Sequence, residues 1–360
     1  MRAIQEALQD CLLRQQVDGR VTIALSGGVD SMVVLDACVR YAKLLAGRAS
    51  SDKSASNSPP ELVFDALHVH HGLSPNADAW ADFCQQQCEK RQVPLVVVRV
   101  KLDPAATGGQ GIEGVARAAR YAAFGRHGAP TILLAQHAND QAETVLHQLL
   151  RGTGLAGLAA MGEARRLSSG QRILRPLLKI SRADIEAYAA EYGVAWISDE
   201  SNDDTTVTRN FIRHELMPPI ERRFPTARTS LARAARHAAE SHQMLEALAK
   251  IDLAWDGHSA YAGVLDSLPV VRQTNALYHW LRWQQTRPPS QAQLEAWAAQ
   301  IFRPSPTDKP HQAGGHGVLI QRRAGVLTLV TGAGQSGSCA GDSGQYGRLR
   351  RGLVGRLTQP

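Results

Sequence analysis

The chain has 360 residues, a formal net charge of +7, 44% hydrophobic residues and 20% charged residues. This length is sufficient for two or three domains with buried cores, and the composition is that of an ordinary globular protein. No stretch of about 18 uninterrupted apolar residues occurs, which excludes a membrane-spanning helix. The N-terminal segment contains acidic residues and predicts an amphipathic helix, not a secretory signal, so we expect a cytoplasmic protein.

The distribution of charge indicates the kind of partner, and the cysteine spacing indicates the state of the thiols. Residues 216–360 contain 17 Lys and Arg against 9 Asp and Glu, whereas residues 1–215 contain 23 against 24. A neutral half joined to a basic half suits a polyanionic partner larger than a nucleotide, although an arginine excess can also serve solubility alone. The five cysteines form no Cys-x-x-Cys pair, and we expect reduced thiols, most of them buried in helices.

The first chemical signal is a loop between an apolar run at 21–25 and a helical pattern at 32–45. It consists of Ser26, Gly27, Gly28, Val29, Asp30 and Ser31. Adjacent glycines let the backbone turn tightly and direct N–H groups at an anion, which the positive end of the following helix also attracts. Kinase-type loops carry lysine where this loop has Asp30, so we expect Mg²⁺ to bridge Asp30 and phosphates. The string SGGVDS resembles the loop of the ATP pyrophosphatases, which split ATP into AMP and pyrophosphate.

Alternating elements follow this loop. Residues 48–61 are polar and predict a surface insertion. Beyond them, strands are predicted at 62–69, 94–100 and 131–135, and helices at 77–91, 114–125 and 140–150. This alternation predicts an α/β fold with a parallel sheet and helices on both faces. Ligands bind beyond the carboxyl ends of such strands, and polar clusters do follow the predicted strands at 26–31, 68–71 and 137–140.

The remainder of the chain has a different pattern. Residues 152–182 are predicted to be loop-rich, and Ser181 is expected to cap a helix over 182–192. A long amphipathic helix is predicted at about 226–255, then helices at 270–283 and 291–301 and strands at 317–321 and 326–330. We therefore expect a first domain over 1–217, a mainly helical α+β domain over 218–332, and a disordered basic tail over 333–360.

Two carboxylates provide the second chemical signal. Asp140, Glu143 and His147 are spaced by three and four, which places them on one helix face just beyond a strand end. Two carboxylates on that face can bind an ammonium group. An acidic residue in the first turn of a helix also stabilises the helix dipole, but the proximity of His137 favours a site.

Six motifs occur in the order found in the bacterial tRNA(Ile)-lysidine synthetases. They are SGGVDS, LHVHHGLSPNAD, GIEGVARAARYAAF, LAQHANDQAETVLHQLLRGTGLAGL, RPLL and VAWISDESNDDTTVTRNFIRHELMPPI. The resemblance is dense over residues 18–224 and weaker up to about residue 331, where PPSQAQLEAW and VLIQRRAGVLTLV resemble that family's substrate-binding domain. SGGVDS indicates the superfamily only, whereas RGTGLAGL and the segment around Arg209 indicate this member.

This resemblance implies a PP-loop ATP pyrophosphatase fold and a defined reaction. Such enzymes use ATP and Mg²⁺ to adenylate the carbon 2 oxygen of the wobble cytidine in tRNA(Ile) with a CAU anticodon. The ε-amine of L-lysine then displaces AMP and forms lysidine. The resemblance implies that the loop at 26–31 binds ATP, that Asp30 holds Mg²⁺, that Asp140 and Glu143 bind lysine, and that Arg120 stabilises the adenylated intermediate.

Further residues are assigned by the same resemblance. Contacts with the tRNA are expected from Arg117, Arg209, Asn210 and Arg213. Arginines spaced by four on a short helix also occur as solvated faces. His71 matches a family histidine near the nucleotide, and we expect it to contact ATP. A monomer and a homodimer both stay open.

Two alternatives to lysidine formation are open at this point. A tRNA cytidine 2-thiolation enzyme of the same superfamily shares the ATP loop but needs reactive paired cysteines, whereas Cys84 and Cys88 are four apart in a predicted helix. A catalytically silent RNA-binding protein would keep the loop for structure alone. The intact carboxylates Asp30, Asp140 and Glu143 argue against it.

Overall fold

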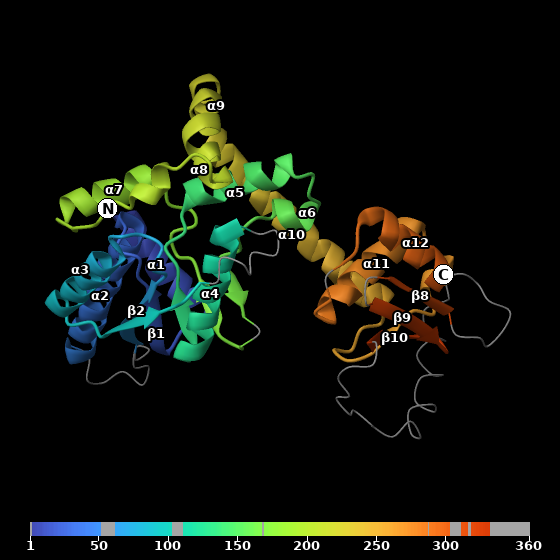
Figure 1. Cartoon of the computed structure of the whole chain (residues 1–360). Coiled ribbons are helices and arrows are strands. Elements are labelled where there is room, and N and C mark those ends of the chain that lie inside the picture. The colour runs from blue at the N-terminus through green and yellow to red at the C-terminus, as the bar shows by residue number, and fades with distance from the viewer. Residues whose placement is uncertain are drawn as a thin grey trace. The chain divides into compact units, whose positions relative to one another are not determined.

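The structure, a computed structural model, describes residues 2–51, 62–102, 111–167, 169–286, 288–302, 311–315 and 318–331. The chain forms two compact units, residues 1–242 and 243–360 (Figure 1). These units divide inside a long helix, and the domain limits expected from the motifs stay a prediction. The predicted basic tail at 333–360 lies outside the described residues.

The first unit contains the predicted alternation of strands and helices. It begins with α1 (Arg2–Arg14), β1 (Gly19–Ala24), α2 (Val29–Ser51), β2 (Leu62–His70), α3 (Ala77–Lys90), β3 (Leu95–Arg99), α4 (Gly111–His127), β4 (Thr131–Leu133) and α5 (Ala138–Leu150). It continues with α6 (Leu155–Leu158), β5 (Ala164–Arg166), β6 (Arg172–Leu174), α7 (Arg182–Glu191), η2 (Glu200–Asp203), α8 (Thr208–Phe211), η3 (Ile212–Leu216), α9 (Met217–Arg223) and α10 (Ala227–Asp252). Helix α10 passes from the first unit into the second.

In the described ranges, the first unit has one six-stranded sheet with the order β3-β2-β1-β4-β6-β5. The pairs β1–β2, β1–β4, β2–β3 and β4–β6 are parallel, which confirms the predicted parallel sheet, and β5 adds an antiparallel edge. The chain passes from β1 to β2 and β3 on one side, and later places β4 on the other side of β1. The connections after β1 and β4 therefore diverge, and ligands bind in such sheets at this point of divergence.

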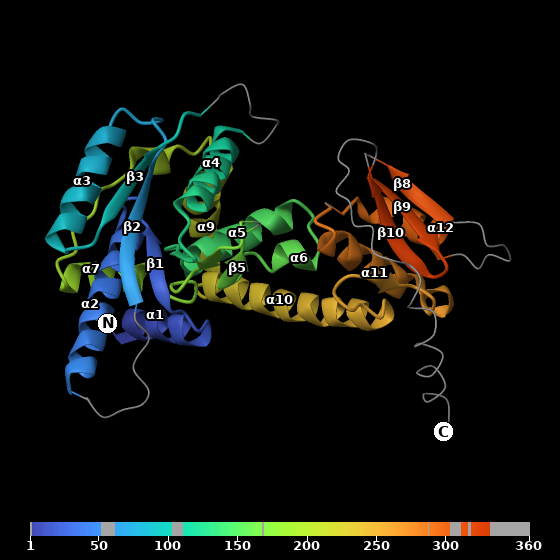
Figure 2. The ribbon, with the colours of Figure 1, turned by 90° about the horizontal axis from the view of Figure 1, so that it is seen from below.

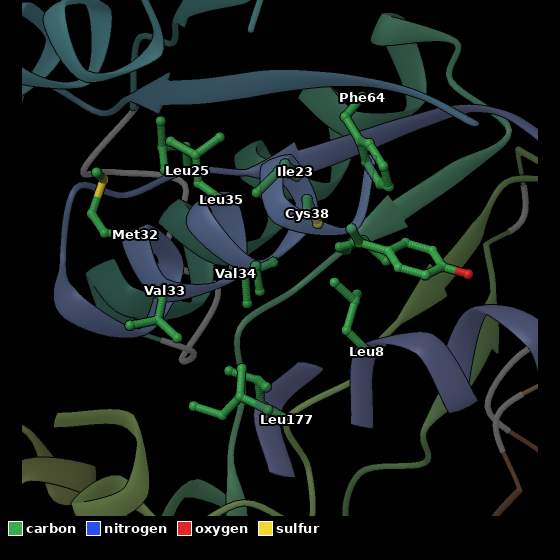
Figure 3. Close-up of a cluster of buried hydrophobic side chains, with 14 of the residues drawn as sticks. Leu8, Ile23, Leu25, Met32, Val33, Val34, Leu35, Cys38, Phe64 and Leu177 are labelled. Carbon is green, nitrogen blue, oxygen red and sulfur yellow. The ribbon is translucent and has the colours of Figure 1, made fainter. Parts of the chain in front are cut away.

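Successive strand residues point into two different cores, one on each face of the sheet. Ile23 of β1 and Leu133 of β4 belong to a core with α1, α2, α3 and α7, where Figure 3 shows Leu8 of α1 beneath the same strands. Ile132 of β4 belongs to a second core with Phe124 of α4. Figure 2 shows α3 and α4 on opposite sides of the sheet, so the prediction of helices on both faces is confirmed.

The structure corrects one of the predicted elements and adds detail to another. Helix α2 runs from Val29 to Ser51, so it includes the start of the predicted polar insertion, whose residues 52–61 lie outside the described residues. The segment 152–182 is loop-rich as predicted, and it also contains the short strands β5 and β6. Each of these strands has three residues, and so short a strand shows too little alternation for recognition from sequence.

Other local predictions are confirmed. Ser181 caps α7, where its Oγ accepts a hydrogen bond from the Asp184 N–H at 3.1 Å. The described cysteines are buried free thiols, namely Cys11, Cys38, Cys84 and Cys88.

The second unit combines helices with an antiparallel sheet, which confirms the α+β prediction. Its described elements are β7 (Ala260–Tyr261), η4 (Leu265–Ser267), α11 (Val270–Trp283), α12 (Gln291–Ile301), β8 (His311–Gly315), β9 (Val318–Arg323) and β10 (Val326–Thr331), with the strand order β7-β10-β9-β8. Trp280 of α11, Ile301 of α12 and Ile320 of β9 share one core. Within the described residues of both units, no helix has the length and apolarity needed to cross a membrane.

Candidate active site

Two serines close the loop that follows β1. Ser31 Oγ donates to the Gly28 carbonyl oxygen at 2.9 Å and accepts from the Ser26 N–H at 3.2 Å. Ser26 Oγ accepts from the Gly28 N–H at 3.4 Å. Because α2 begins at Val29, the positive end of its dipole and its first N–H groups face this loop. This arrangement of strand, loop and helix suits an anion.

Gly27 is required in this loop for two reasons. Its φ of +89° lies in the left-handed region that residues with a Cβ rarely adopt. A Cβ would also lie 2.7 Å from Cδ1 of Ile197, whose backbone N–H donates to the Gly27 carbonyl oxygen at 3.0 Å. At Gly28, by contrast, the nearest neighbour of an added Cβ is Ser26 Oγ at 3.6 Å, an ordinary contact.

Replacing Gly27 by alanine is expected to destabilise the protein by about 1–3 kcal/mol, because the backbone conformation and the contact with Ile197 both disfavour a methyl group. Gly28→Ala is the matched control and should cost less than about 1 kcal/mol. Urea unfolding followed by circular dichroism measures both. Equal unfolding midpoints for the two variants would show that residue 27 needs no glycine.

Asp30 lies in the first turn of α2, and residues from two distant segments hold it. Nη1 of Arg182, at the start of α7, donates to both carboxylate oxygens at 3.0 and 2.9 Å. Nε2 of His137 lies 3.5 Å from Oδ1. Burial raises the pKa of Asp30 above its usual value, Asp140 raises it further, and His137 and Arg182 oppose the rise. The carboxylates of Asp30 and Asp140 are therefore close enough to interact.

His137 connects these two carboxylates. His137 is the N-cap of α5, and its Nδ1 accepts a hydrogen bond from the backbone N–H of Asn139 (3.2 Å). The backbone N–H of His137 donates to Asp140 Oδ2 (3.1 Å). Because Nδ1 is an acceptor, the ring proton belongs on Nε2. Nε2 lies 3.5 Å from Asp30 Oδ1 and 3.6 Å from Asp140 Oδ2, so it is placed between the two acids.

The two carboxylates of α5 are paired with two arginines that follow α7. Arg213 donates through Nε and Nη2 to the two oxygens of Glu143, at 2.8 and 2.9 Å. Arg209 donates to Asp140 at 2.7 Å and to Glu143 at 3.2 Å. The Glu143 side chain is only 1% exposed, and these arginines supply the positive charge that a buried carboxylate requires.

A π-helical turn brings both arginines to the same carboxylates. Arg209 lies in α8 and Arg213 in η3, a π-helical turn between α8 and α9. Such a turn locally widens a helix and is frequent at functional sites. Asn210, between them, is 8% exposed and donates to the Asp204 carbonyl oxygen at 2.9 Å, which fixes the preceding turn. Its contact with RNA stays a prediction.

His71 directly follows β2, and the charge of Arg120, on α4, reaches its imidazole. His68 ties this end of β2 to the loop, because its Nδ1 lies 2.9 Å from the carbonyl oxygen of Leu25. Both ring nitrogens of His71 are buried, and neither has a hydrogen-bond partner within the described part of the chain. Burial lowers the pKa of His71 to about 4, with further contributions from Arg120, His68 and His70. A neutral imidazole with two unused nitrogens is available to a ligand.

We expect the His71 imidazole to titrate with a midpoint at about pH 4, because burial lowers its pKa. In the unfolded chain its pKa is about 6.5, so between pH 6.5 and 4 only the unfolded state takes up the proton and acidification lowers stability. An NMR titration of the histidine ring carbons measures the midpoint, and the His71→Gln variant identifies the resonance. A midpoint above pH 6 would show that the ring is solvated and charged like an exposed histidine.

The structure brings most predicted site residues together. We call the connected set of Asp30, His137, Asp140, Glu143, Arg182, Arg209 and Arg213 the carboxylate–arginine network. His137 entered the prediction only as a neighbour of Asp140, and Arg182 was not predicted as a site residue. The only local signal for His137 is its position just after β4, and Arg182 has none, because it is 152 residues from Asp30.

Arg117 lies apart from the network and donates instead to the hydroxyl of Tyr121 at 3.3 Å.

The carboxylates of the network determine which metal ion it can hold. Within the described residues, no group of three His, Cys, Asp or Glu side chains converges as a dedicated metal site would require. Mg²⁺ does not need such a group, because it is usually held by one or two carboxylates together with substrate phosphates and water. Asp30 and Asp140 offer that donor set beside the loop, so the residues fit this ion.

Two different protein-family models match the two parts of the chain. Residues 1–220 match the PP-loop domain, and residues 262–328 match the TilS substrate binding domain. The chain is 43% identical over 271 residues to the tRNA(Ile)-lysidine synthase of Pseudomonas fluorescens (strain Pf0-1), which covers 72% of the chain and 57% of that relative. It is 43% identical over 289 residues to the same-named protein of Pseudomonas putida, which covers 77% of the chain and 63% of that relative. The chain thus spans about three fifths of the length of these curated relatives.

A solved structure supports the fold. The U34-tRNA thiolase NcsA from Methanococcus maripaludis, solved with its 4Fe-4S cluster, aligns with a TM-score of 0.51 and 15% sequence identity. The alignment covers 66% of this chain and 79% of that one. At this level of identity the likeness shows the fold alone.

Proposed function

The chain belongs to the PP-loop domain family, and on this premise we propose that it ligates L-lysine to carbon 2 of the wobble cytidine of tRNA(Ile) with a CAU anticodon, using ATP. The observation that carries this proposal is the carboxylate–arginine network, which joins the loop after β1 to the carboxylates of α5 where the sheet's connections diverge. The relatives named tRNA(Ile)-lysidine synthase and the match of residues 262–328 support the choice of substrate.

In the first step, the oxygen on carbon 2 of the cytidine attacks the α-phosphorus of ATP and pyrophosphate leaves. The N–H groups of the loop and the dipole of α2 hold the phosphates in place. Arg120 adds positive charge beside His71, where the nucleotide would meet the unused ring nitrogens. Transfer of this kind depends mainly on positioning and on neutralising charge, which these groups provide.

Asp30 and Asp140 are the residues proposed to hold Mg²⁺. When bound, the ion would neutralise phosphate charge and orient the phosphates. Arg182 pairs with Glu186 at 2.7 Å as well as with Asp30, so it keeps a partner when the Asp30 carboxylate binds the ion.

In the second step, the ε-ammonium of lysine first loses a proton to solvent, and the neutral amine attacks carbon 2. The bond between carbon 2 and the oxygen of AMP breaks, AMP leaves with that oxygen, and the new C–N nitrogen loses a second proton to solvent. Asp140 and Glu143 are proposed to hold the ammonium groups of lysine. Both are paired with Arg209 and Arg213, so lysine must share or displace these donors, and a carboxylate has several acceptor positions. Asp140, at 8% exposure, is more accessible than Glu143, at 1%.

Arg209 and Arg213 are also the residues proposed to meet the tRNA. A guanidinium displaced from a carboxylate by lysine is free to pair with a phosphate, for which its planar geometry is suited. The exchange would couple lysine entry to the presence of RNA. We place the reaction in the cytoplasm.

The geometry does not favour the sulfur-transfer alternative. Burial raises the pKa of Cys84 to about 12 and that of Cys88 to about 11. A reactive cysteine has the opposite property, a pKa lowered toward neutrality that keeps the thiolate populated. These two α3 cysteines are therefore packing residues.

The test uses radiolabelled L-lysine, ATP with Mg²⁺, and an unmodified tRNA(Ile) transcript with a CAU anticodon. We expect acid-insoluble label that requires ATP and appears together with AMP and pyrophosphate. An initiator methionine tRNA, which has the same anticodon, is the control for substrate choice. Absence of label with the tRNA(Ile) transcript, under conditions where the protein is folded and binds ATP, would refute the proposed reaction.

A further inference from the structure

Three arginines from three different elements gather around Tyr121 of α4, outside the carboxylate–arginine network. Arg117 of α4 donates through Nη2 to the Tyr121 hydroxyl at 3.3 Å, and its Cζ lies 5.1 Å from the ring centroid. Cζ of Arg165, on β5, lies 5.9 Å from the same centroid. Arg175, directly after β6, is close enough to Tyr121, Arg117 and Arg165 for their charges to affect its pKa. We call these four residues the Tyr121 cluster.

Among the residues whose side chains the structure describes, no acid compensates the positive charge of this cluster. Among the described residues, none of its arginines forms an ion pair with a carboxylate, whereas Glu163, on the same segment as Arg165, is paired with Arg14 at 2.8 Å. Arg175 is only 2% exposed and donates to the neutral oxygens of Gln136 and Gly162, both at 2.8 Å. Burial lowers the pKa of Arg175, Tyr121 opposes that shift, and Arg117 and Arg165 add to it. A buried cation without a counter-charge is unfavourable, and an anion would relieve that cost.

A purely structural role explains only part of this arrangement. The bonds of Arg175 to Gln136 and Gly162 hold two loops together, which accounts for that residue. They do not account for Arg117 and Arg165, which are both exposed and whose like charges repel each other beside Tyr121. Exposed arginines that have no carboxylate partner within the described ranges are well suited to a phosphate, which they can bind with two parallel hydrogen bonds.

The cluster also lies next to the candidate active site. Gln136, which accepts from Arg175, directly precedes His137, the residue placed between Asp30 and Asp140. Arg175 and Gln136 follow the neighbouring strands β6 and β4, so both lie at the carboxyl edge of the sheet where the site is built. The contact between Arg175 and Gln136 therefore links the cluster to the residue that precedes His137.

We propose that the Tyr121 cluster binds a backbone phosphodiester of the RNA substrate close to the nucleotide that is modified. This rests on the proposed function for the identity of the RNA, but binding itself does not require the reaction. Phosphate contacts of this kind fix the register of an RNA without reading its sequence. They would hold the anticodon loop while the wobble base enters the site. The other source of the same chemistry is the pyrophosphate part of ATP, which the test separates.

The test compares Arg165→Ala with Arg166→Ala. These neighbours on β5 are both exposed, and because successive strand residues point to opposite faces, only Arg165 approaches Tyr121. The dissociation constant of a fluorescent tRNA(Ile) transcript with a CAU anticodon is measured without ATP or lysine at several salt concentrations. For Arg165→Ala we expect roughly five- to tenfold weaker binding and a salt slope reduced by about one. Arg166→Ala should keep the wild-type slope.

Two further measurements make the result decisive. Arg117→Ala should weaken tRNA binding to a similar extent, while inhibition by inorganic pyrophosphate and the KM for ATP should change less than about twofold in both cluster variants. A tRNA affinity and salt slope unchanged in Arg117→Ala and Arg165→Ala would overturn the proposal. A rise in the KM for ATP or loss of pyrophosphate inhibition, with unchanged tRNA binding, would assign the cluster to the nucleotide instead. Failure of lysine transfer with normal tRNA binding would refute the proposed reaction but not this site.

Discussion

Alanine in place of Asp30 is expected to lower ATP-dependent lysine transfer by about 10³-fold or more, with little effect on folding. The carboxylate lies between the loop after β1 and His137, and its removal leaves Asp140 as the one acid proposed to hold Mg²⁺. Its pair with Arg182 is partly exposed, at 28% and 39%, so its loss should cost at most about 1 kcal/mol of stability. Single-turnover transfer of radiolabelled lysine and urea unfolding measure the two effects.

Glu186→Gln is the matched control for this experiment. Glu186 is the second carboxylate bound to Arg182, at 2.7 Å, and it takes no part in the network around His137. Its replacement disturbs Arg182 to a similar degree while leaving Asp30 in place, so we expect transfer within about twofold of the wild type. Normal activity of Asp30→Ala would contradict the proposal that Asp30 holds Mg²⁺. An equal loss in both variants would show that Arg182, not Asp30, is the critical group.

Glu143→Gln is expected to affect both folding and activity. Removing one member of a buried ion pair costs about 3–5 kcal/mol when the partner is left buried. Here Arg209 and Arg213 are 36% and 30% exposed and keep Asp140 as a partner, so we expect about 1–3 kcal/mol. Lysine transfer should fall by about 10²-fold or more, because both arginines lose the acceptor that places them.

A double-mutant cycle with Arg213→Met separates the pair from its surroundings. If Glu143 and Arg213 stabilise the fold chiefly through their two hydrogen bonds, the double variant should be about 1–3 kcal/mol more stable than the sum of the single changes predicts. Urea unfolding of the four proteins gives this coupling. Additive effects would mean that Glu143 is tolerated in the core without its contact to Arg213.

Local sequence patterns predicted the scaffold well. The apolar run before Ser26 and the paired glycines after it mark β1 and its loop, because a tight turn before a helix needs those residues. The 3.6-residue period marks α11 and α12 at 270–283 and 291–301, the same limits that the structure shows. The strands β5 and β6 were not predicted, because each has three residues and a strand of that length is too short to show alternation.

The candidate site was predicted only in part. Asp30, Asp140 and Glu143 were recognisable because they follow predicted strand ends, Asp140 and Glu143 share a helix face, and all three aim at one edge of the sheet. The roles of Arg182 and His137 were not recognisable. An N-terminal helix residue and a histidine after a strand have many ordinary uses, and what distinguishes these two is contact with Asp30.

The sequence by itself determined which residue types occur at the carboxyl ends of the strands, and therefore where chemistry would be located. Only the tertiary structure decided how these residues are paired. Asp30 meets Arg182 across 152 residues, and Glu143 meets Arg213 across 70. Such pairings depend on how the packing of the sheet orders distant segments, whereas periodicity and capping act within a few turns of the chain. Local sequence patterns therefore identify the acidic residues of the site, whereas the tertiary structure determines which arginine pairs with each of them.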